Sequence, residues 1–272
     1  MIDVLYHYTN IESLALILKN KTFRLNSLNN MDDLEENMTA DVKNVGMFTY
    51  ISSWTDSSRE SIALWKQYTN TTTGVRIELP KNPFKKYSVK NMLSPSLLKQ
   101  MNITDENIKS IIRLDKMLAS KYFTQVLTGD DILFKVIYTE DEDKILPKIY
   151  SYDAATDSGT LALGEVGKYK RYDWNYQKEW RYIIQFLPEN VLTVLTDGGK
   201  SFQKVFVDIM NGTAKQPFPY YDLEIADEAF KKMKVVLSPT ISPGNEILIR
   251  NALDYYNKDA TIAESKFKGK MK

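Results

Sequence analysis

The sequence contains no cysteine and only one histidine, His7. Without cysteine, the protein has no thiol nucleophile, no disulfide and no cysteine-ligated zinc site. A single histidine also excludes a metal centre built from two or three imidazoles. Any imidazole chemistry must therefore come from His7. The alternative is a strand histidine that only packs and forms hydrogen bonds.

The sequence also lacks an excess of charge of one sign. Its 36 basic and 35 acidic residues give a formal net charge of +1, so no broad phosphate-binding surface is indicated, although a nucleic acid is still compatible as a substrate. No run approaches the roughly 18 apolar residues of a membrane helix, and the N-terminus lacks the basic and apolar regions of a signal peptide. Together with the missing cysteine, these features predict a cytoplasmic protein that does not bind membranes.

Several chemical motifs are incomplete. The Gly-Gly-Lys-Ser run at 198–201 resembles the end of a phosphate loop, but Val194 stands where that loop requires its first glycine. The acidic run at 141–143 lacks the glycine and the final glutamate of a calcium loop, which favours a solvated charge run. No Gly-x-Ser-x-Gly elbow presents a serine to His7. The sequence therefore predicts no metal site and no dinucleotide fingerprint.

Apolar and aromatic residues are sufficient for a large core. Hydrophobic residues make up 43% of the chain, and 17 tyrosines and 11 phenylalanines favour half-buried sheet surfaces. Alternating or buried apolar runs predict roughly eight strands without regular βαβ alternation, and hence an α+β fold. We expect strands near 4–8, 22–25, 48–54, 75–79, 133–138, 179–186, 204–207 and 234–237, and helices near 11–18, 62–68, 104–127 and 247–256.

The first helix shows the clearest start and stop signals. Thr9 and Glu12 have the spacing of a capping box, and Asn20 suits the left-handed residue after the helix. We expect one domain over residues 1–260, with insertions near 29–45, 85–130 and 139–170. Residues 261–272 are expected to form a basic flexible tail.

Three segments place polar side chains inside otherwise hydrophobic strands. The first is Leu-Tyr-His-Tyr-Thr at 5–9. The second is Ile-Ser-Ser-Trp-Thr at 51–55, followed by a Trp-x-x-Tyr helix at 65–68 and Gly-Val-Arg-Ile-Glu at 74–78. The third is Tyr-Gln-Lys-Glu-Trp-Arg at 176–181.

Together these motifs resemble a family of bacterial and phage proteins defined by a domain of unknown function, related to the AbiG-type abortive-infection proteins. The resemblance covers residues 4–186, with a weaker echo at 237–249. One loop departs from the family pattern. Where the family has Asn-Asp-Pro-x-Glu, this chain has Asp-Asp-Leu-Glu-Glu at 32–36.

The same segments are similar to the His-Tyr-Glu branch of the ADP-ribosyltransferase superfamily. That resemblance implies an ADP-ribosyltransferase-like split β-sheet with flanking helices. It also implies NAD as co-substrate and transfer of ADP-ribose to a macromolecular acceptor, a protein or a nucleic acid, in conflict between bacteria and phages. These implications are analogies at the level of the fold.

The chemistry suits a protein with one histidine and no cysteine. Nicotinamide is already a cationic leaving group, so the protein needs to bind the ribose, stack the ring and place negative charge near an oxocarbenium ion. The resemblance implies His7 and Glu179 as catalytic residues. The residues implied for NAD binding are His7, Tyr8, Thr9, Ser52, Ser53, Trp54, Tyr68 and Arg181.

Simpler interpretations compete with these roles. Glu179 would pair only with Arg181 or Lys178 at a sheet edge, and Tyr68 would belong to the core. The corresponding alternative function is a non-catalytic relative that binds a nucleotide or a partner, such as the antitoxin or regulator of a two-gene system. A further alternative is NAD hydrolysis, which differs only in the acceptor.

Overall fold

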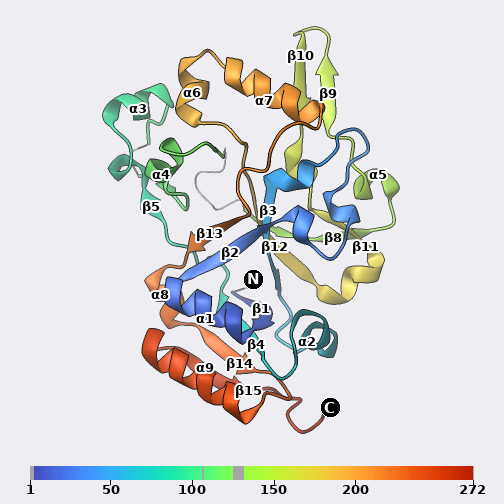
Figure 1. The fold of residues 1–272 in the computed structure, drawn as a ribbon, viewed down its shortest axis with the longest axis vertical. Helices are drawn as coiled ribbons and strands as arrows, with labels where there is room; N and C mark the ends of the chain where they lie inside the picture. Colours follow the sequence, from blue (N-terminus) through green and yellow to red (C-terminus); the bar gives the residue numbers. More distant parts are fainter. Residues whose placement is uncertain (1–2, 106, 125–131, 272) are drawn as a thin grey trace.

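The computed structural model describes residues 3–105, 107–124 and 132–271. Nine strands form the main sheet: β1 (Val4–Asn10), β2 (Thr22–Ser27), β3 (Thr49–Thr55), β4 (Gly74–Pro80), β7 (Leu133–Lys135), β12 (Glu179–Gln185), β13 (Tyr220–Glu224), β14 (Lys234–Leu237) and β15 (Thr261–Glu264). They follow the order β13-β2-β3-β1-β4-β14-β15, with β12 also beside β3 and β7 beside β12 (Figure 1). The class is α+β, as predicted.

The sheet splits along one edge of β3. At one end of this strand, Ile51 pairs with Asn26 of β2, and at the other end Thr55 pairs with Tyr6 of β1. Between these two points, no described strand pairs with that edge. The opposite edge of β3 is covered along its whole length by β12. The sheet therefore opens between β1 and β2, directly beside residues 52–54.

Helices and short 3₁₀ turns surround this sheet. The α-helices are α1 (Ile11–Asn20), α2 (Ile62–Tyr68), α3 (Pro95–Gln100), α4 (Leu114–Leu118), α5 (Glu142–Ile145), α6 (Val191–Thr196), α7 (Lys200–Met210), α8 (Asp227–Lys231) and α9 (Pro243–Tyr256). The 3₁₀ helices are η1 (Leu28–Asn30), η2 (Glu35–Asn37), η3 (Val45–Phe48), η4 (Val89–Asn91), η5 (Leu163–Glu165) and η6 (Tyr172–Gln177). Among the described residues, no helix is both long and apolar enough to cross a membrane.

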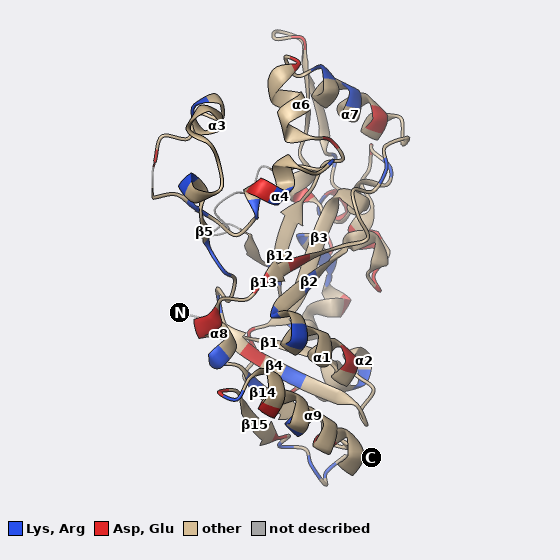
Figure 2. Ribbon diagram, turned by 60° about the vertical axis from the view of Figure 1, so that its left-hand side comes forward, with Lys and Arg blue, Asp and Glu red and all other residues tan. Residues whose placement is uncertain are grey.

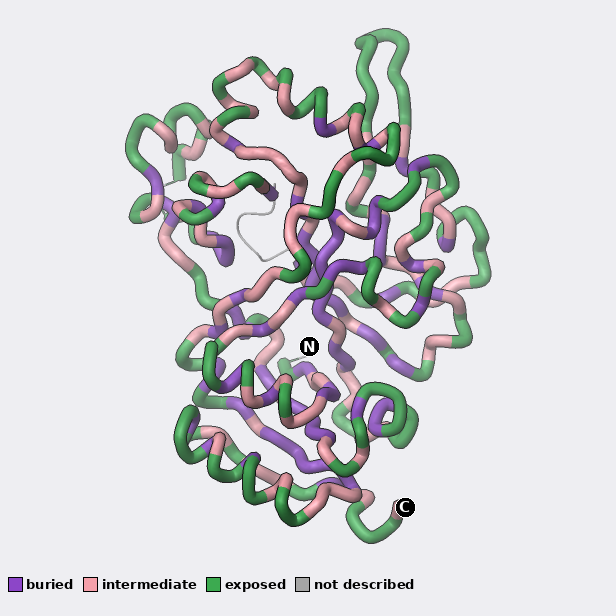
Figure 3. The backbone as a smooth tube through the Cα atoms, in the orientation of Figure 1, coloured by how far each residue is buried: buried purple, intermediate pink, exposed green. Residues whose placement is uncertain are grey.

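Three smaller sheets lie apart from the main sheet, and two of them, β5–β6 and β9–β10, lie within regions expected as insertions. They pair β5 (Tyr87–Ser88) with β6 (Lys109–Ser110), β8 (Ile137–Thr139) with β11 (Tyr169–Arg171), and β9 (Tyr150–Asp153) with β10 (Ser158–Leu161). The β9–β10 hairpin projects from the molecule and is exposed, whereas the main-sheet strands are largely buried (Figure 3). Basic and acidic residues are interspersed over the same elements (Figure 2).

Strand alternation gives the two faces of the sheet different cores. One face carries a large continuous core that includes Leu5, Trp54 and Tyr182. The other face carries two separate clusters, one around Ile51 and Ile183 and one around Tyr8, Leu64, Trp65 and Val236. Ser53 and Thr55 of β3 and Glu179 and Arg181 of β12 lie on this second face, in the gap between the two clusters, whereas Ser52 lies on the first face beside Trp54.

The two capping residues of the first helix each lie one position later than predicted. Asn10, not Thr9, is its N-cap, because the Asn10 side chain accepts a hydrogen bond from the Ser13 amide. Thr9 remains in β1, where it pairs with Val75. The left-handed residue is correspondingly Lys21, with φ of 52°, rather than Asn20. The predicted helix is therefore correct in place and type, and only its capping residues shift by one position.

Three other predictions are corrected. Residues 204–207 belong to α7 and not to a strand, since Val205 and Ile209 are buried at helical spacing and a short apolar run does not distinguish the two. The helix predicted over 104–127 is instead the short β6 and α4, and 125–127 lie outside the described residues. The expected flexible tail starts as strand β15, which pairs in parallel with β14.

Candidate functional site

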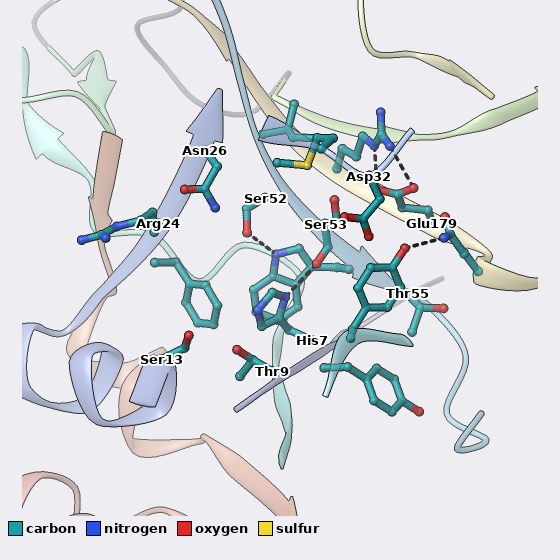
Figure 4. A pocket seen from close by; sticks show the side chains of 18 of the residues that line it. His7, Thr9, Ser13, Arg24, Asn26, Asp32, Ser52, Ser53, Thr55 and Glu179 are labelled. Atoms are coloured by element: carbon teal, nitrogen blue, oxygen red, sulfur yellow. Dashed lines mark hydrogen bonds and ion pairs between the residues drawn. The ribbon is translucent and has the colours of Figure 1, made fainter. Parts of the chain in front are cut away.

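A pocket of about 400 Å³ opens at the split in the sheet (Figure 4). The structure brings every site residue predicted from the sequence to the wall of this one pocket. Their roles in binding or catalysis stay predictions. The nine residues are His7, Tyr8, Thr9, Ser52, Ser53, Trp54, Tyr68, Glu179 and Arg181.

His7 closes the open edge of β3. Its Nδ1 lies 2.8 Å from the carbonyl oxygen of Ser53, in the stretch where no described strand pairs with β3. A carbonyl only accepts hydrogen bonds, so Nδ1 carries the proton. Burial lowers the pKa of His7 from its ordinary 6.5, opposed by this hydrogen bond. The ring is therefore neutral at pH 7 and offers Nε2 as an acceptor, to which no described residue donates.

Three aromatic residues were predicted as stacking surfaces, and they differ in exposure. Trp54 is 3% exposed and donates from Nε1 to the hydroxyl of Ser52 at 3.1 Å. Tyr8 is 8% exposed, and its hydroxyl accepts from the amide of Ser61. Tyr68 is 38% exposed. Of the three residues, Tyr68 is therefore the most accessible to solvent.

Glu179 belongs to a buried network of four charged residues. Its Oε1 lies 2.6 Å from Arg181 Nε, and its Oε2 lies 3.0 Å from Lys170 Nζ. Both cations also contact Glu36, at 2.8 Å for Lys170. None of the four residues is more than 6% exposed. Two carboxylates thus share two cations, and the pairing of Glu179 with Arg181 that formed the simpler interpretation is present.

This network fixes the ionisation of Glu179. Burial raises the pKa of its carboxyl, but the charges of Arg181 and Lys170 outweigh burial and lower it to about 2, with help from the Ser53 hydroxyl. The carboxylate is consequently ionised at neutral pH. Its charge is largely compensated by its two cationic neighbours, which weakens the field that it projects into the pocket.

His7 and Glu179 reach the pocket from different faces of the sheet. Glu179 pairs with Thr55 across β12 and β3, and so shares the face of the polar gap. The ring of His7 packs against Trp54, with 5.1 Å between ring centroids, on the face of the large core. Both line the same pocket because the split removes the backbone that would separate the faces. No contact between them occurs among the described residues.

Several lining residues were not assigned a role from the sequence. Glu36 and Lys170 complete the charged network, and Gln177 donates to the hydroxyl of Tyr68 at 2.5 Å. Glu36 belongs to the acidic loop at 32–36, whose sequence departs from the family pattern. No local pattern in the sequence indicates the role of Lys170, because its partners Glu36 and Glu179 lie on other elements, η2 and β12. Within the described ranges, no three histidine or acidic side chains group to hold a metal ion.

Comparison with known proteins identifies part of the chain. Residues 64–182 match the family described as "Protein of unknown function (DUF2971)". A domain of this family, whose function is unknown, thus occupies the segment from α2 to β12. It includes Tyr68, Glu179 and Arg181 but not His7. No curated protein and no solved structure gives a significant match.

Proposed function

We propose that the protein is an NAD-dependent ADP-ribosyltransferase that modifies a macromolecular acceptor in bacterial or phage conflict. One observation carries this proposal: three segments far apart in the sequence, with their polar side chains inside hydrophobic strands, converge on a single pocket at the split of the sheet. These residues offer a hydrogen-bond acceptor, aromatic rings and a carboxylate, which would serve NAD chemistry without a metal or a thiol. The pocket volume of about 400 Å³ is within the usual range for small-molecule sites.

The proposed arrangement gives each wall of the pocket a task. The free Nε2 of His7 accepts a hydrogen bond from a ribose hydroxyl, and the exposed ring of Tyr68 stacks on nicotinamide. The acidic surroundings of Tyr68 favour the positively charged ring at this end. Burial is the main cause that raises the pKa of the Tyr68 hydroxyl, and the charges of Glu179, Tyr176, Asp32 and Glu36 raise it further. Glu179 supplies negative charge beside the developing oxocarbenium ion.

A second function has its own support. Glu179 is held by Arg181 and Lys170 in a network that needs no ligand to be complete. A carboxylate neutralised in this way contributes less to an oxocarbenium ion than a free one. This observation favours a non-catalytic relative that binds a nucleotide or a partner protein, such as a cognate antitoxin. Simple NAD hydrolysis would use the same site with water as acceptor.

Release of nicotinamide from labelled NAD separates these functions. The wild-type protein is assayed with cell extract, protein, RNA and DNA as acceptors. Changing Glu179→Gln keeps the shape and removes the charge. For a transferase, we expect NAD binding to remain nearly intact and nicotinamide release to fall by about two to four orders of magnitude.

The same assay has clear contrary outcomes. A wild-type protein that binds NAD but releases no nicotinamide with any acceptor is a binding module. A protein that does not bind NAD at all removes the superfamily resemblance as a guide to function.

A further inference from the structure

Gln177 is a buried polar residue of the pocket wall to which the proposed chemistry gives no task. It is 4% exposed and is the last residue of η6, whose C-cap, Lys178, is left-handed with φ of 47°. This turn leads from η6 into β12, and it places Gln177 and Glu179 against the same amine of Lys170, at 2.9 and 3.0 Å. A buried amide group needs hydrogen-bond partners for its oxygen and for its nitrogen.

Lys170 fixes which way the Gln177 amide points. The ammonium group of a lysine only donates hydrogen bonds, so the atom that lies 2.9 Å from Lys170 Nζ is the amide oxygen Oε1. The amide nitrogen Nε2 consequently faces the other way, where it lies 2.5 Å from the hydroxyl oxygen of Tyr68. Gln177 is therefore the donor in this contact, and the Tyr68 oxygen is the acceptor.

The Tyr68 hydroxyl keeps its own proton for another partner. Its oxygen accepts from Gln177, and no described residue accepts the hydroxyl proton. Burial, followed by nearby charges of which Glu179 is the first, raises the pKa of this hydroxyl, so the group stays protonated at neutral pH. A phenol hydroxyl lies in the plane of its ring. The proton therefore points past the ring edge and not toward a group stacked on the ring face.

The same contact links α2 to the charged network. Tyr68 is the last residue of α2, and the preceding Gln67 accepts a hydrogen bond from Tyr176 of η6. Both contacts between α2 and η6 join residues 109 positions apart. Tyr176 is 44% exposed and does not line the pocket, whereas Gln177 is buried in the pocket wall. Gln177 thus fixes the Tyr68 ring relative to Lys170 and its carboxylate partners.

We propose that Gln177 is the positioning residue of this pocket: it holds the Tyr68 ring and orients the hydroxyl so that its proton is donated to an oxygen of the bound ligand. This inference rests on the proposed function for its ligand. When nicotinamide stacks on the ring, the adjoining ribose supplies oxygens beside the ring edge. Tyr68 then donates to the ribose, and Nε2 of His7 accepts from it. A ribose hydroxyl can do both, so the two groups are complementary to it.

Nitration by tetranitromethane tests the positioning without NAD. The reagent modifies accessible phenolates, and peptide mass spectrometry follows Tyr68 relative to Tyr255, which is 79% exposed. Gln177→Leu removes the hydrogen bond, and we expect the relative nitration of Tyr68 to rise about threefold. Tyr182, which is 1% exposed, reports any general loosening and should stay unmodified. An unchanged ratio for Tyr68 would show that other contacts hold the ring and would overturn the proposal.

Titration with NAD tests the direction of the hydrogen bond. Tyr68→Phe removes the hydroxyl and should weaken NAD binding about fivefold. Gln177→Glu supplies a carboxylate that accepts the Tyr68 proton, so it should weaken binding by a similar factor, and this effect should vanish in the Tyr68→Phe background. Gln67→Glu is the matched control, because Gln67 is an exposed residue of α2 that does not line the pocket. It adds the same charge and should change affinity less than about twofold.

Each result of the titration has a separate meaning. A Tyr68→Phe variant that binds NAD like wild type, or a Gln177→Glu effect that is equally large without the hydroxyl, would overturn the donor role and the proposal with it. A wild-type protein that does not bind NAD removes the proposed function, and nitration then decides the positioning role alone. Binding that follows these expectations without release of nicotinamide supports the role of Gln177 in a non-catalytic protein.

Discussion

The imidazole of His7 offers its two nitrogens to different partners. Nδ1 donates to Ser53 and replaces the strand neighbour that β3 lacks at the split. Nε2 is left for a ligand, because the lowered pKa keeps the ring neutral. A structural role of this histidine, through Nδ1, is therefore compatible with a functional role, through Nε2.

Two substitutions distinguish the nitrogens. His7→Asn keeps an N–H that can donate to Ser53 and leaves no acceptor at the position of Nε2, so NAD affinity should fall about three- to tenfold with a small change in Tm. His7→Ala removes both and should lower NAD affinity and Tm together. The measurements are NAD titration and thermal unfolding. If His7→Asn bound NAD as wild type does, Nε2 would have no role in binding.

At the level of elements, the buried network joins three segments that are not neighbours in the sequence. Glu36 lies on η2, Lys170 on β11, and Glu179 and Arg181 on β12. Contacts between opposite charges fix η2 against the sheet and hence position Glu36 in the wall of the pocket. A buried network of this kind is sensitive to the loss of one member, because the remaining charges stay buried.

Lys170→Met tests this dependence. It leaves Glu36 and Glu179 with Arg181 as their shared cation and should lower the free energy of unfolding by about 3 kcal/mol. The control is Lys168→Met, since Lys168 pairs with Glu165 at 3.1 Å in a more exposed position and should cost less than about 1 kcal/mol. Denaturant unfolding measures both. Adding Glu36→Gln to Lys170→Met should recover part of the loss, and equal effects of the two lysine variants would contradict this account.

Sequence patterns predicted the helices and strands better than they predicted which side chains contact one another. The predicted bounds of β14, residues 234–237, match the observed strand, because Lys-Val-Val-Leu is a short run rich in β-branched residues. The pocket residues could be predicted where a polar side chain interrupts such a run, as at His7 and Glu179. Lys170 could not, because nothing within a few residues shows that it will meet Glu36 and Glu179. The segment 204–207 failed for another reason: its apolar run fits a strand and a helix equally.

For the whole molecule, the paired carboxylates predict sensitivity to acid. The folded pKa of Glu179 is about 2, below its ordinary value of 4.5, because Arg181 and Lys170 outweigh burial. The stabilisation is present above pH 4.5 and is lost as the pH falls toward 2. We expect Tm to decrease by roughly 5–10 °C between about pH 5.5 and about pH 3. Glu179→Gln should show a weaker dependence on pH, and an identical slope in both proteins would exclude this source.

The branching of the sheet at β3 also has a consequence for the order of folding. Ser53 meets His7, 46 positions earlier in the chain, whereas Thr55 donates to Lys178, 123 positions later. Contacts between distant residues form slowly, because the intervening chain must be ordered first. During synthesis from the N-terminus, the edge of β3 that later pairs with β12 therefore remains uncovered until β12 has been synthesised. That edge belongs to an apolar strand, so the nascent protein is exposed to wrong pairing for most of its synthesis. The pocket is complete only after β12 and then β13, which carries the lining residue Asp222, have been synthesised.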